Sequence, residues 1–309
     1  MIDRLIEKIK ETGAPVLVGL DPTYEMIPGY LKKEMLEMYG KTPKAVAEMF
    51  YAFNCAILDE VGDLIPAVKP QIAMYERYGL DGIDCYLRTI EYAKTKGLLV
   101  IGDVKRGDIS STAKAYAAHI GGVEIEGEFF DPWKEDAVTV NPYLGTDGID
   151  PFLPYCKDGN KGIFVLIKTS NPSSGEFQDR LIEGEPLYCR VADMVGRWGE
   201  ASVGRYGYST VGAVVGATYK EQGEALRKRL PHTFFLVPGY GAQGGKGADM
   251  KNYYDADGLG IIVNSSRGII AAYRKDPEFA PEETVGPEFS QASKKAVLAM
   301  KADLQNGMK

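Results

Sequence analysis

The segment Ile101–Ile109, I-G-D-V-K-R-G-D-I, carries two carboxylates and an ammonium directly after an apolar run. If this run is a buried strand, its two-residue period places Asp103 and Lys105 on the same face. Asp108 then lies beyond the strand, in the loop that opens the next helix. Because burying an unpaired charge costs on the order of several kcal/mol, these groups must face one another or a ligand. We therefore expect a charged functional site here; the alternative is a salt-bridged surface turn at K-R-G-D.

Eight short apolar runs recur along the chain, each followed by a helical or turn-rich stretch. They are Pro15–Asp21, Ile65–Gln71, Leu98–Lys105, Ala137–Tyr143, Gly162–Thr169, Val211–Ala217, Thr233–Gly239 and Leu259–Ser265. Apolar strands alternating with helices predict a parallel sheet covered on both faces, and eight such units are the number at which an α/β TIM barrel, (β/α)8, closes. A doubly wound open sheet is the alternative, although the first strand–helix turn has no G-x-G-x-x-G motif.

Polar side chains gather at or just beyond the carboxyl ends of these strands, where barrels of this class place their reactive groups. They are Asp21, Lys69, Asp103, Lys105, Asn141, Thr169, Ser170, Gln243 and Arg267. Each residue alone is weak evidence, because any soluble barrel carries polar loops. Together they favour a site at one mouth of the barrel.

A glycine-rich loop and an arginine follow the last two strands. Pro238–Gly247, P-G-Y-G-A-Q-G-G-K-G, contains five glycines that allow backbone N–H groups to approach an anion, and Arg267 ends the eighth strand with a fork suited to phosphate. Because loops after strands seven and eight form the usual phosphate site of such barrels, we expect a phosphorylated substrate. The alternative is a flexible surface loop without a ligand.

The helical segments are amphipathic. Met1–Thr12 has apolar residues at helical spacing, Thr42-Pro43 is typical of a helix start, and the helix Asp84–Lys96 is followed by a C-terminal glycine, Gly97. Further helices are expected at Ser110–His119, Leu187–Trp198, Lys220–Leu230 and Gln291–Leu304. We expect Gly121–Glu135, which carries three aromatic residues, to pack under a long loop. Because no linker separates these elements, we predict a single domain, residues 1–309, with an N-terminal helix and extended loops.

Composition narrows the function classes. The 309-residue chain has a net charge of −7 and no long basic run, which argues against nucleic acid as a partner. Its four cysteines lack a C-x-x-C pair and it has only two histidines, so neither a zinc site nor a disulfide framework is expected. No stretch approaches transmembrane length and the N-terminus is unlike a signal peptide. We expect a cytoplasmic protein that acts on a small molecule, without a membrane partner.

A set of motifs in strand order resembles the orotidine 5′-phosphate decarboxylase family. D-V-K-R-G-D-I is similar to that family's D-x-K-x-x-D-I signature, and it occurs here with G-L-D-P, A-V-K-P-Q, T-S-N-P, V-P-G-Y-G-A-Q-G-G and V-N-S-S-R-G. D-x-K-x-x-D alone is shared with related metal-dependent sugar-phosphate barrels, but the full set is more specific. T-V-N-P-Y-L-G resembles the larger bacterial subgroup of the family.

The resemblance implies a charge array and a homodimer with shared active sites. Lys69, Asp103 and Lys105 would alternate with Asp108 from a second subunit, whose Ile109 would line the neighbouring pyrimidine pocket. The other residues carried over by motif would contact orotidine 5′-monophosphate. They are Asp21 and Thr112, with Lys69, at the ribose; Ser170, or Thr169 in its place, at the pyrimidine; Gln243 and Arg267 at the phosphate; and Pro238 in the loop that closes over it.

The resemblance also implies a reaction without metal or other cofactor. CO₂ would leave C6 of the pyrimidine, and Lys105 would stabilise and then protonate the carbanion. One alternative is a Mg²⁺-dependent decarboxylase or aldolase acting on a keto-sugar phosphate, with Asp103 as a metal ligand. Another is a non-catalytic nucleotide-binding barrel.

Overall fold

Eight parallel strands form a closed barrel. The computed structural model describes residues 1–241, 244–279 and 285–308. Around the barrel the strands are β1 (Val16–Leu20), β12 (Ile261–Ser265), β11 (Thr233–Val237), β10 (Ser209–Val215), β7 (Gly162–Lys168), β6 (Ala137–Val140), β3 (Leu99–Arg106) and β2 (Ala67–Pro70). Because β1 pairs with both β2 and β12, none of these eight barrel strands has a free edge. The predicted TIM barrel is confirmed, and the doubly wound open sheet is wrong.

The barrel strands are apolar on both faces because both faces are covered. Leu17, Phe164 and Leu236 fill the barrel interior, whereas residues of opposite parity such as Val16 and Val18 face the surrounding helices. Burying each such side chain contributes roughly 1.5–3 kcal/mol. This explains why the strands appear in the sequence as continuous apolar runs rather than as alternating ones.

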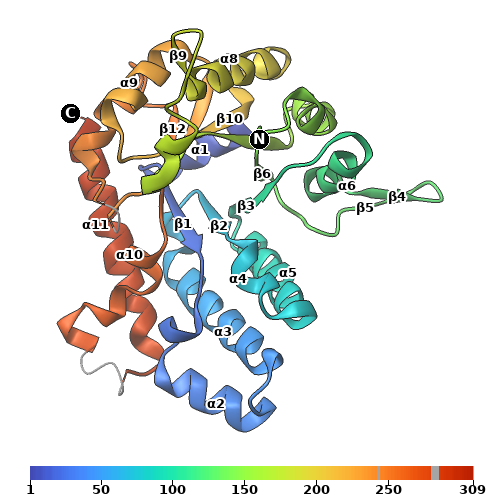
Figure 1. Cartoon of the computed structure of the whole chain (residues 1–309). Coiled ribbons are helices and arrows are strands. Elements are labelled where there is room, and N and C mark those ends of the chain that lie inside the picture. The colour runs from blue at the N-terminus through green and yellow to red at the C-terminus, as the bar shows by residue number, and fades with distance from the viewer. Residues whose placement is uncertain (242–243, 280–284, 309) are drawn as a thin grey trace.

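Helices surround the barrel (Figure 1). They are α1 (Ile2–Thr12), α2 (Gly29–Tyr39), α3 (Pro43–Val61), α4 (Ile72–Glu76), α5 (Gly79–Thr95), α6 (Ser110–Gly121), α7 (Leu153–Lys157), α8 (Leu187–Gly199), α9 (Lys220–Arg229), α10 (Arg267–Ile270) and α11 (Ser290–Met308). Among the described residues, no helix combines the length and the apolar composition needed to cross a bilayer.

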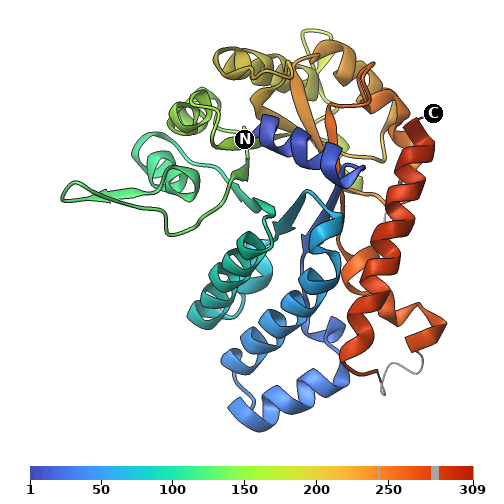
Figure 2. The same cartoon turned by 180° about the vertical axis from the view of Figure 1, so that it is seen from behind.

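The first helix closes the amino-terminal end of the barrel. Figure 2 shows α1 crossing this end, and its Ile2, Leu5, Ile6 and Ile9 join the cluster that fills the barrel interior. The amphipathic helix predicted at Met1–Thr12 is confirmed. With this end covered, the opposite, carboxyl end of the strands is the open mouth.

Capping residues mark the helix ends largely as predicted. The Thr42 side chain accepts a hydrogen bond from the Ala45 N–H at the start of α3, and Gly97 follows α5 with φ of 71°. However, α5 begins at Gly79, five residues before the predicted Asp84. Its first turn carries a fully exposed Leu80 and two glycines, so the apolar periodicity starts only later.

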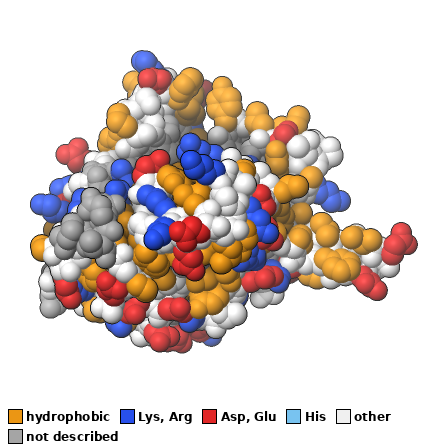
Figure 3. All heavy atoms as spheres, turned by 90° about the horizontal axis from the view of Figure 1, so that it is seen from below, with side chains coloured by type: hydrophobic (Ala, Val, Ile, Leu, Met, Phe, Trp, Pro, Cys, Tyr) orange, Lys and Arg blue, Asp and Glu red, His pale blue; other side chains and the backbone are white. Residues whose placement is uncertain are grey.

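Residues 121–135 form a projecting hairpin rather than a segment packed under a loop. The hairpin consists of β4 (Val123–Ile125) and β5 (Glu128–Phe130), and it extends away from the barrel with apolar side chains on its surface (Figure 3). Phe129 and Phe130 are 68% and 45% exposed, so the prediction for them is wrong. Of the three aromatic residues of this segment, only Trp133 packs inward, with its ring 4.1 Å from the ring of His119.

Candidate active site

Asp103, in the second half of β3, is the centre of a buried charge cluster at the mouth. Its Oδ1 accepts hydrogen bonds from Lys105 Nζ at 2.6 Å and Thr139 Oγ1 at 2.8 Å. Its Oδ2 accepts from Lys69 Nζ at 2.6 Å and Gln71 Nε2 at 2.8 Å. These four donors occupy the four lone-pair positions of a carboxylate. Asp103 is only 6% exposed, so the centre of the cluster is buried, which favours a functional site over a salt-bridged surface turn.

The two ammonium groups keep Asp103 ionised. Burial raises the pKa of the Asp103 carboxyl, but Lys69 and Lys105 outweigh this effect and hold the pKa well below its usual value. Burial likewise lowers the pKa of Lys69, yet the carboxylates of Asp103 and Asp21 bring it above its usual value. At neutral pH the cluster therefore consists of one carboxylate between two ammonium groups.

The backbone of Lys105 is strained. Its φ is 44°, a left-handed conformation that costs a non-glycine residue roughly 1–3 kcal/mol. The Lys105 N–H donates to Thr139 Oγ1 at 3.0 Å, and the pairing of β3 with β6 shifts register between Gly102 and Arg106. The twisted strand end directs the Lys105 ammonium, whose side chain is 47% exposed, toward both Asp103 and the open mouth.

Asp103→Ala should destabilise the protein by roughly 3–5 kcal/mol at pH 7, because it leaves Lys69 buried without a counter-charge. The pKa of Asp103 is depressed in the folded state, so its contribution is complete above the unfolded pKa of about 3.9 and is lost progressively as pH falls from there through the lower folded pKa. Denaturant unfolding at pH 7 and pH 3 measures this difference. Asp108→Ala is the control: Asp108 is partly exposed and, among the described residues, its side chain bonds only to its neighbour's N–H, so a loss of about 1 kcal/mol or less is expected. Equal losses in the two variants would contradict the prediction.

Two adjoining cavities open at the mouth and share Lys69, Asp103 and Pro238 in their walls. The first, of about 350 Å³, has an apolar floor formed by Leu166, Val214 and Leu236. The second, of about 300 Å³, is more polar and is called the polar cavity below. Most sequence-predicted site residues line one or the other: Asp21, Lys69, Asp103, Lys105, Thr169, Ser170, Pro238 and Arg267. An apolar slot beside a polar one fits a flat ring attached to a polar tail.

The polar cavity contains unsatisfied acceptors. Asp21 Oδ1 and Asn264 Oδ1 are buried and have no hydrogen-bond partner among the described residues. Two such acceptors beside Lys69 and an exposed Arg267 suit a ligand that offers hydroxyl donors next to an anion.

The polar residues of the site that sequence reasoning missed include Thr23, Gln71, Thr139, Asn171, Asn264 and Ser266. Their position at strand ends was the available signal, since Gln71 follows β2 and Thr139 lies in β6. It was too general to single them out. Asn141, expected inside a strand, lies just after β6, where its side chain accepts from the Tyr143 N–H at 3.0 Å.

Three predicted residues are not part of these cavities in the single chain. Asp108, Ile109 and Thr112 lie at the start of α6, and Asp108 Oδ1 accepts from the Ile109 N–H at 2.8 Å. Ile109 is 48% exposed. Gln243 lies outside the described residues.

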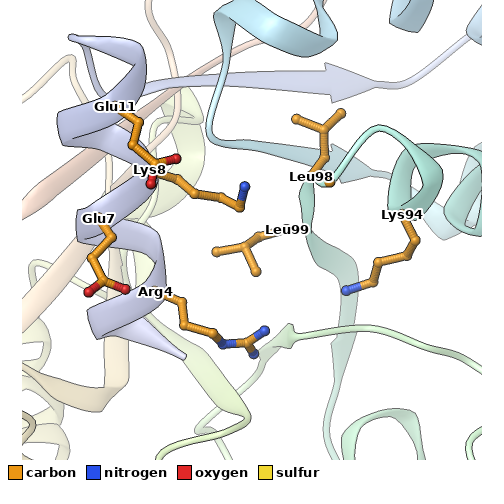
Figure 4. Close-up of a pocket in the computed structure, with 8 residues that line it drawn as sticks. Arg4, Glu7, Lys8, Glu11, Lys94, Leu98 and Leu99 are labelled. Carbon is orange, nitrogen blue, oxygen red and sulfur yellow. The ribbon is translucent and has the colours of Figure 1, made fainter.

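A third cavity, of about 330 Å³, lies at the opposite end of the barrel beside α1 (Figure 4). Arg4, Lys8 and Lys94 point into it, and both Arg4 and Lys94 form ion pairs with Asp136. Charged residues at this end of a TIM barrel typically serve stability, so we place the chemistry at the mouth.

Fold and site together define a (β/α)8-barrel enzyme with a lysine–aspartate array between two cavities at the mouth. The family model described as "Orotidine 5'-phosphate decarboxylase / HUMPS family" matches residues 14–283. The chain belongs to this family, and it is a carboxy-lyase.

Named relatives agree with this assignment. The chain is 45% identical over 273 residues to orotidine 5′-phosphate decarboxylase of Caldicellulosiruptor saccharolyticus, covering 88% of this chain and 90% of the relative. It is 42% identical to that of Clostridium novyi, over 98% of both chains. The crystal structure of a Toxoplasma gondii protein assigned as an orotidine-monophosphate decarboxylase superimposes with a TM-score of 0.74 at 30% identity, over 96% of this chain and 98% of that one.

Proposed function

We propose that the protein converts orotidine 5′-monophosphate to uridine 5′-monophosphate and CO₂, a step of pyrimidine nucleotide synthesis. The observation that carries the proposal is the Lys69–Asp103–Lys105 array at the edge of an apolar slot. The slot suits a pyrimidine, and the polar cavity beside it suits ribose and phosphate. The names of the relatives support this substrate.

In the proposed reaction the bond between C6 and the carboxylate breaks and its electron pair stays on C6. The ring delocalises this charge poorly, so the barrier is lowered mainly by electrostatic stabilisation. Lys105 provides a fixed ammonium, and its proton is then transferred to C6 as CO₂ departs. Neutral Lys105 regains a proton from solvent, so the net reaction consumes one proton and releases uridine 5′-monophosphate and CO₂.

Asp103 holds Lys105 in place through their ion pair, and Lys69 in turn holds the other oxygen of Asp103. Because ammonium, amide and hydroxyl groups already surround Asp103 with four donors, it has no free lone pair for a metal ion. This favours the metal-independent reaction over the Mg²⁺-dependent alternative. In the described part of the chain, no three His, Cys, Asp or Glu side chains are grouped to hold a metal.

The remaining substrate-binding roles are assigned from the residues that line the two cavities. Asp21, with its unpaired oxygen, would accept from a ribose hydroxyl, and Arg267 would bind phosphate together with Gln243 and the loop that begins at Pro238. Ser170 is favoured over Thr169 at the pyrimidine. The Thr169 hydroxyl is already bonded to Asn171 and Gln178, whereas the Ser170 hydroxyl bonds to no other described residue.

We also propose that the active unit is a cytoplasmic homodimer with shared active sites. Asp108 and Thr112 would complete the partner's array and ribose site, and Ile109 would line its pyrimidine pocket. Two features support this: Asp108 forms no ion pair with any described residue of its own chain, and exposed apolar side chains gather near the mouth and on the adjacent hairpin. They are Ile109, Tyr143, Leu144, Phe129 and Phe130.

The test is turnover of orotidine 5′-monophosphate by the purified protein, followed by loss of substrate absorbance. We expect full activity in excess EDTA and formation of equal amounts of uridine 5′-monophosphate and CO₂. Activity that is lost in EDTA and restored by Mg²⁺ would favour the keto-sugar-phosphate class. Binding of uridine 5′-monophosphate without turnover would favour the non-catalytic barrel.

A further inference from the structure

The loop after β7, residues 169–180, forms one wall of the apolar slot, the cavity lined by Leu166, Val214 and Leu236. Its first residue, Thr169, is held by Gln178 from the same loop. Gln178 contacts Thr169 twice: its Oε1 accepts from the Thr169 N–H at 2.9 Å, and its Nε2 donates to Thr169 Oγ1 at 2.8 Å. Gln178 does not line the slot but borders a neighbouring cavity. It therefore fixes both the backbone and the side chain of Thr169 without reaching the substrate space.

An ion pair between Lys168 and Asp179 fixes the end of the same loop. Lys168, the last residue of β7, is fully buried, and its Nζ donates to both Asp179 carboxylate oxygens at 2.8 and 3.0 Å and to Ser174 Oγ at 3.2 Å. The ammonium also lies 4.3 Å from the centre of the Tyr219 ring. An ammonium with no exposure needs its counter-charge, so Asp179 is held at this position, directly beside Gln178 in the chain.

Ser170 directly follows Lys168 and Thr169, the two residues that these contacts hold. The register between β7 and β10 shifts where Val215 pairs with Lys168, so the Lys168 side chain lies away from the slot, whereas Ser170 borders it. The backbone of Ser170 packs on Gly216: a Cβ at Gly216 would lie 3.0 Å from Ser170 Cα. The Gly216 N–H in turn donates to the Lys168 carbonyl at 2.8 Å.

We propose that Lys168, Thr169, Gln178 and Asp179, here named the clasp, position Ser170 for recognition of the pyrimidine. The clasp residues Lys168, Gln178 and Asp179 are positioning residues that contact no substrate. This inference rests on the proposed function, because it assigns the ring of orotidine 5′-monophosphate to the slot. It predicts that loosening the clasp weakens binding of the ring but leaves binding of the ribose phosphate unchanged.

Gln178→Ala tests the clasp, with Gln305→Ala as the matched control. In the part of the chain that the structure describes, the Gln305 side chain makes a single hydrogen bond, to the Gly13 carbonyl, at a distance from the mouth. For Gln178→Ala we expect KM and the Kd of uridine 5′-monophosphate to rise about ten-fold, as after loss of one oriented hydrogen bond, and kcat to change less than KM. The Kd of ribose 5-phosphate, which lacks the ring, should stay within about two-fold of wild type. Gln305→Ala should match wild type in all three.

Two further variants separate positioning from folding. Asp179→Asn keeps the size of the side chain and should reproduce the selective rise in Kd, whatever its thermal midpoint. Ser170→Ala and the Ser170→Ala/Gln178→Ala double variant should bind uridine 5′-monophosphate equally weakly, because both act through one hydroxyl. Three results would each overturn this proposal. They are equal weakening of ribose 5-phosphate binding, fully additive effects of Ser170→Ala and Gln178→Ala on the Kd of uridine 5′-monophosphate, and an unchanged Kd of uridine 5′-monophosphate in the clasp variants. Absence of turnover by the wild type would instead overturn the proposed function.

Discussion

Lys105→Ala is expected to reduce kcat for decarboxylation at least about ten-thousand-fold, since it removes both the fixed cation and the proton donor. Nucleotide binding should survive, because the apolar slot, Asp21 and Arg267 remain. Loss of substrate absorbance measures turnover, and isothermal titration with uridine 5′-monophosphate measures binding.

Lys228→Ala is the control for this variant. Lys228 is an exposed lysine on α9 whose ion pair with Glu224 has little energetic weight, so activity should equal that of wild type. A Lys105→Ala protein that retains a tenth or more of wild-type kcat would remove Lys105 from the chemistry. Loss of both turnover and binding, with an unchanged fold, would instead mean that Lys105 serves to bind the nucleotide.

Mixing inactive Lys105→Ala and Asp108→Ala proteins should restore activity. If Asp108 completes the partner's site, each mixed dimer has one intact site and one doubly altered site. Random exchange of subunits makes half of the dimers mixed, so about a quarter of wild-type activity should return. The measurement is turnover after the two proteins are unfolded and refolded together.

The matched control mixes Lys105→Ala with Asp103→Ala. Lys105 and Asp103 form an ion pair within one chain at 2.6 Å, so no mixed dimer would contain an intact site and no activity should return. Recovery in the control, or none in the test mixture while Asp108→Ala alone is inactive, would contradict sharing of the site between subunits.

Much of the barrel could be predicted because its signals are local and repeated. Eight apolar runs, the Thr42 cap and the glycine after α5 each report on a few neighbouring residues, and all are confirmed. The hairpin at 123–130 was misjudged because its apolar residues suggest burial, yet Phe129 is largely exposed in the single chain. The single-domain organisation stays a prediction.

The site was predictable as a set of residues but not as a geometry. Strand ends indicated Lys69, Asp103 and Lys105, since charges there must find partners. The two neutral donors that saturate Asp103, Gln71 and Thr139, could not be singled out, because polar residues at strand ends are common. The positive φ of Lys105 and the outward direction of Lys168 arise from register shifts between strands, which no local pattern reports. Asp108, Ile109 and Thr112, at and just before the start of α6, were assigned to a partner's site, and their roles stay predictions.

The central claim, that Lys105 exchanges a proton with C6 of the bound pyrimidine, is tested most directly in D₂O. Wild-type protein should replace the C6 hydrogen of 5-fluorouridine 5′-monophosphate, which the neighbouring fluorine acidifies, with deuterium, as followed by ¹H NMR. Lys105→Ala, saturated with the same nucleotide, should show no exchange above the rate without protein. Exchange by Lys105→Ala at the wild-type rate would contradict the account.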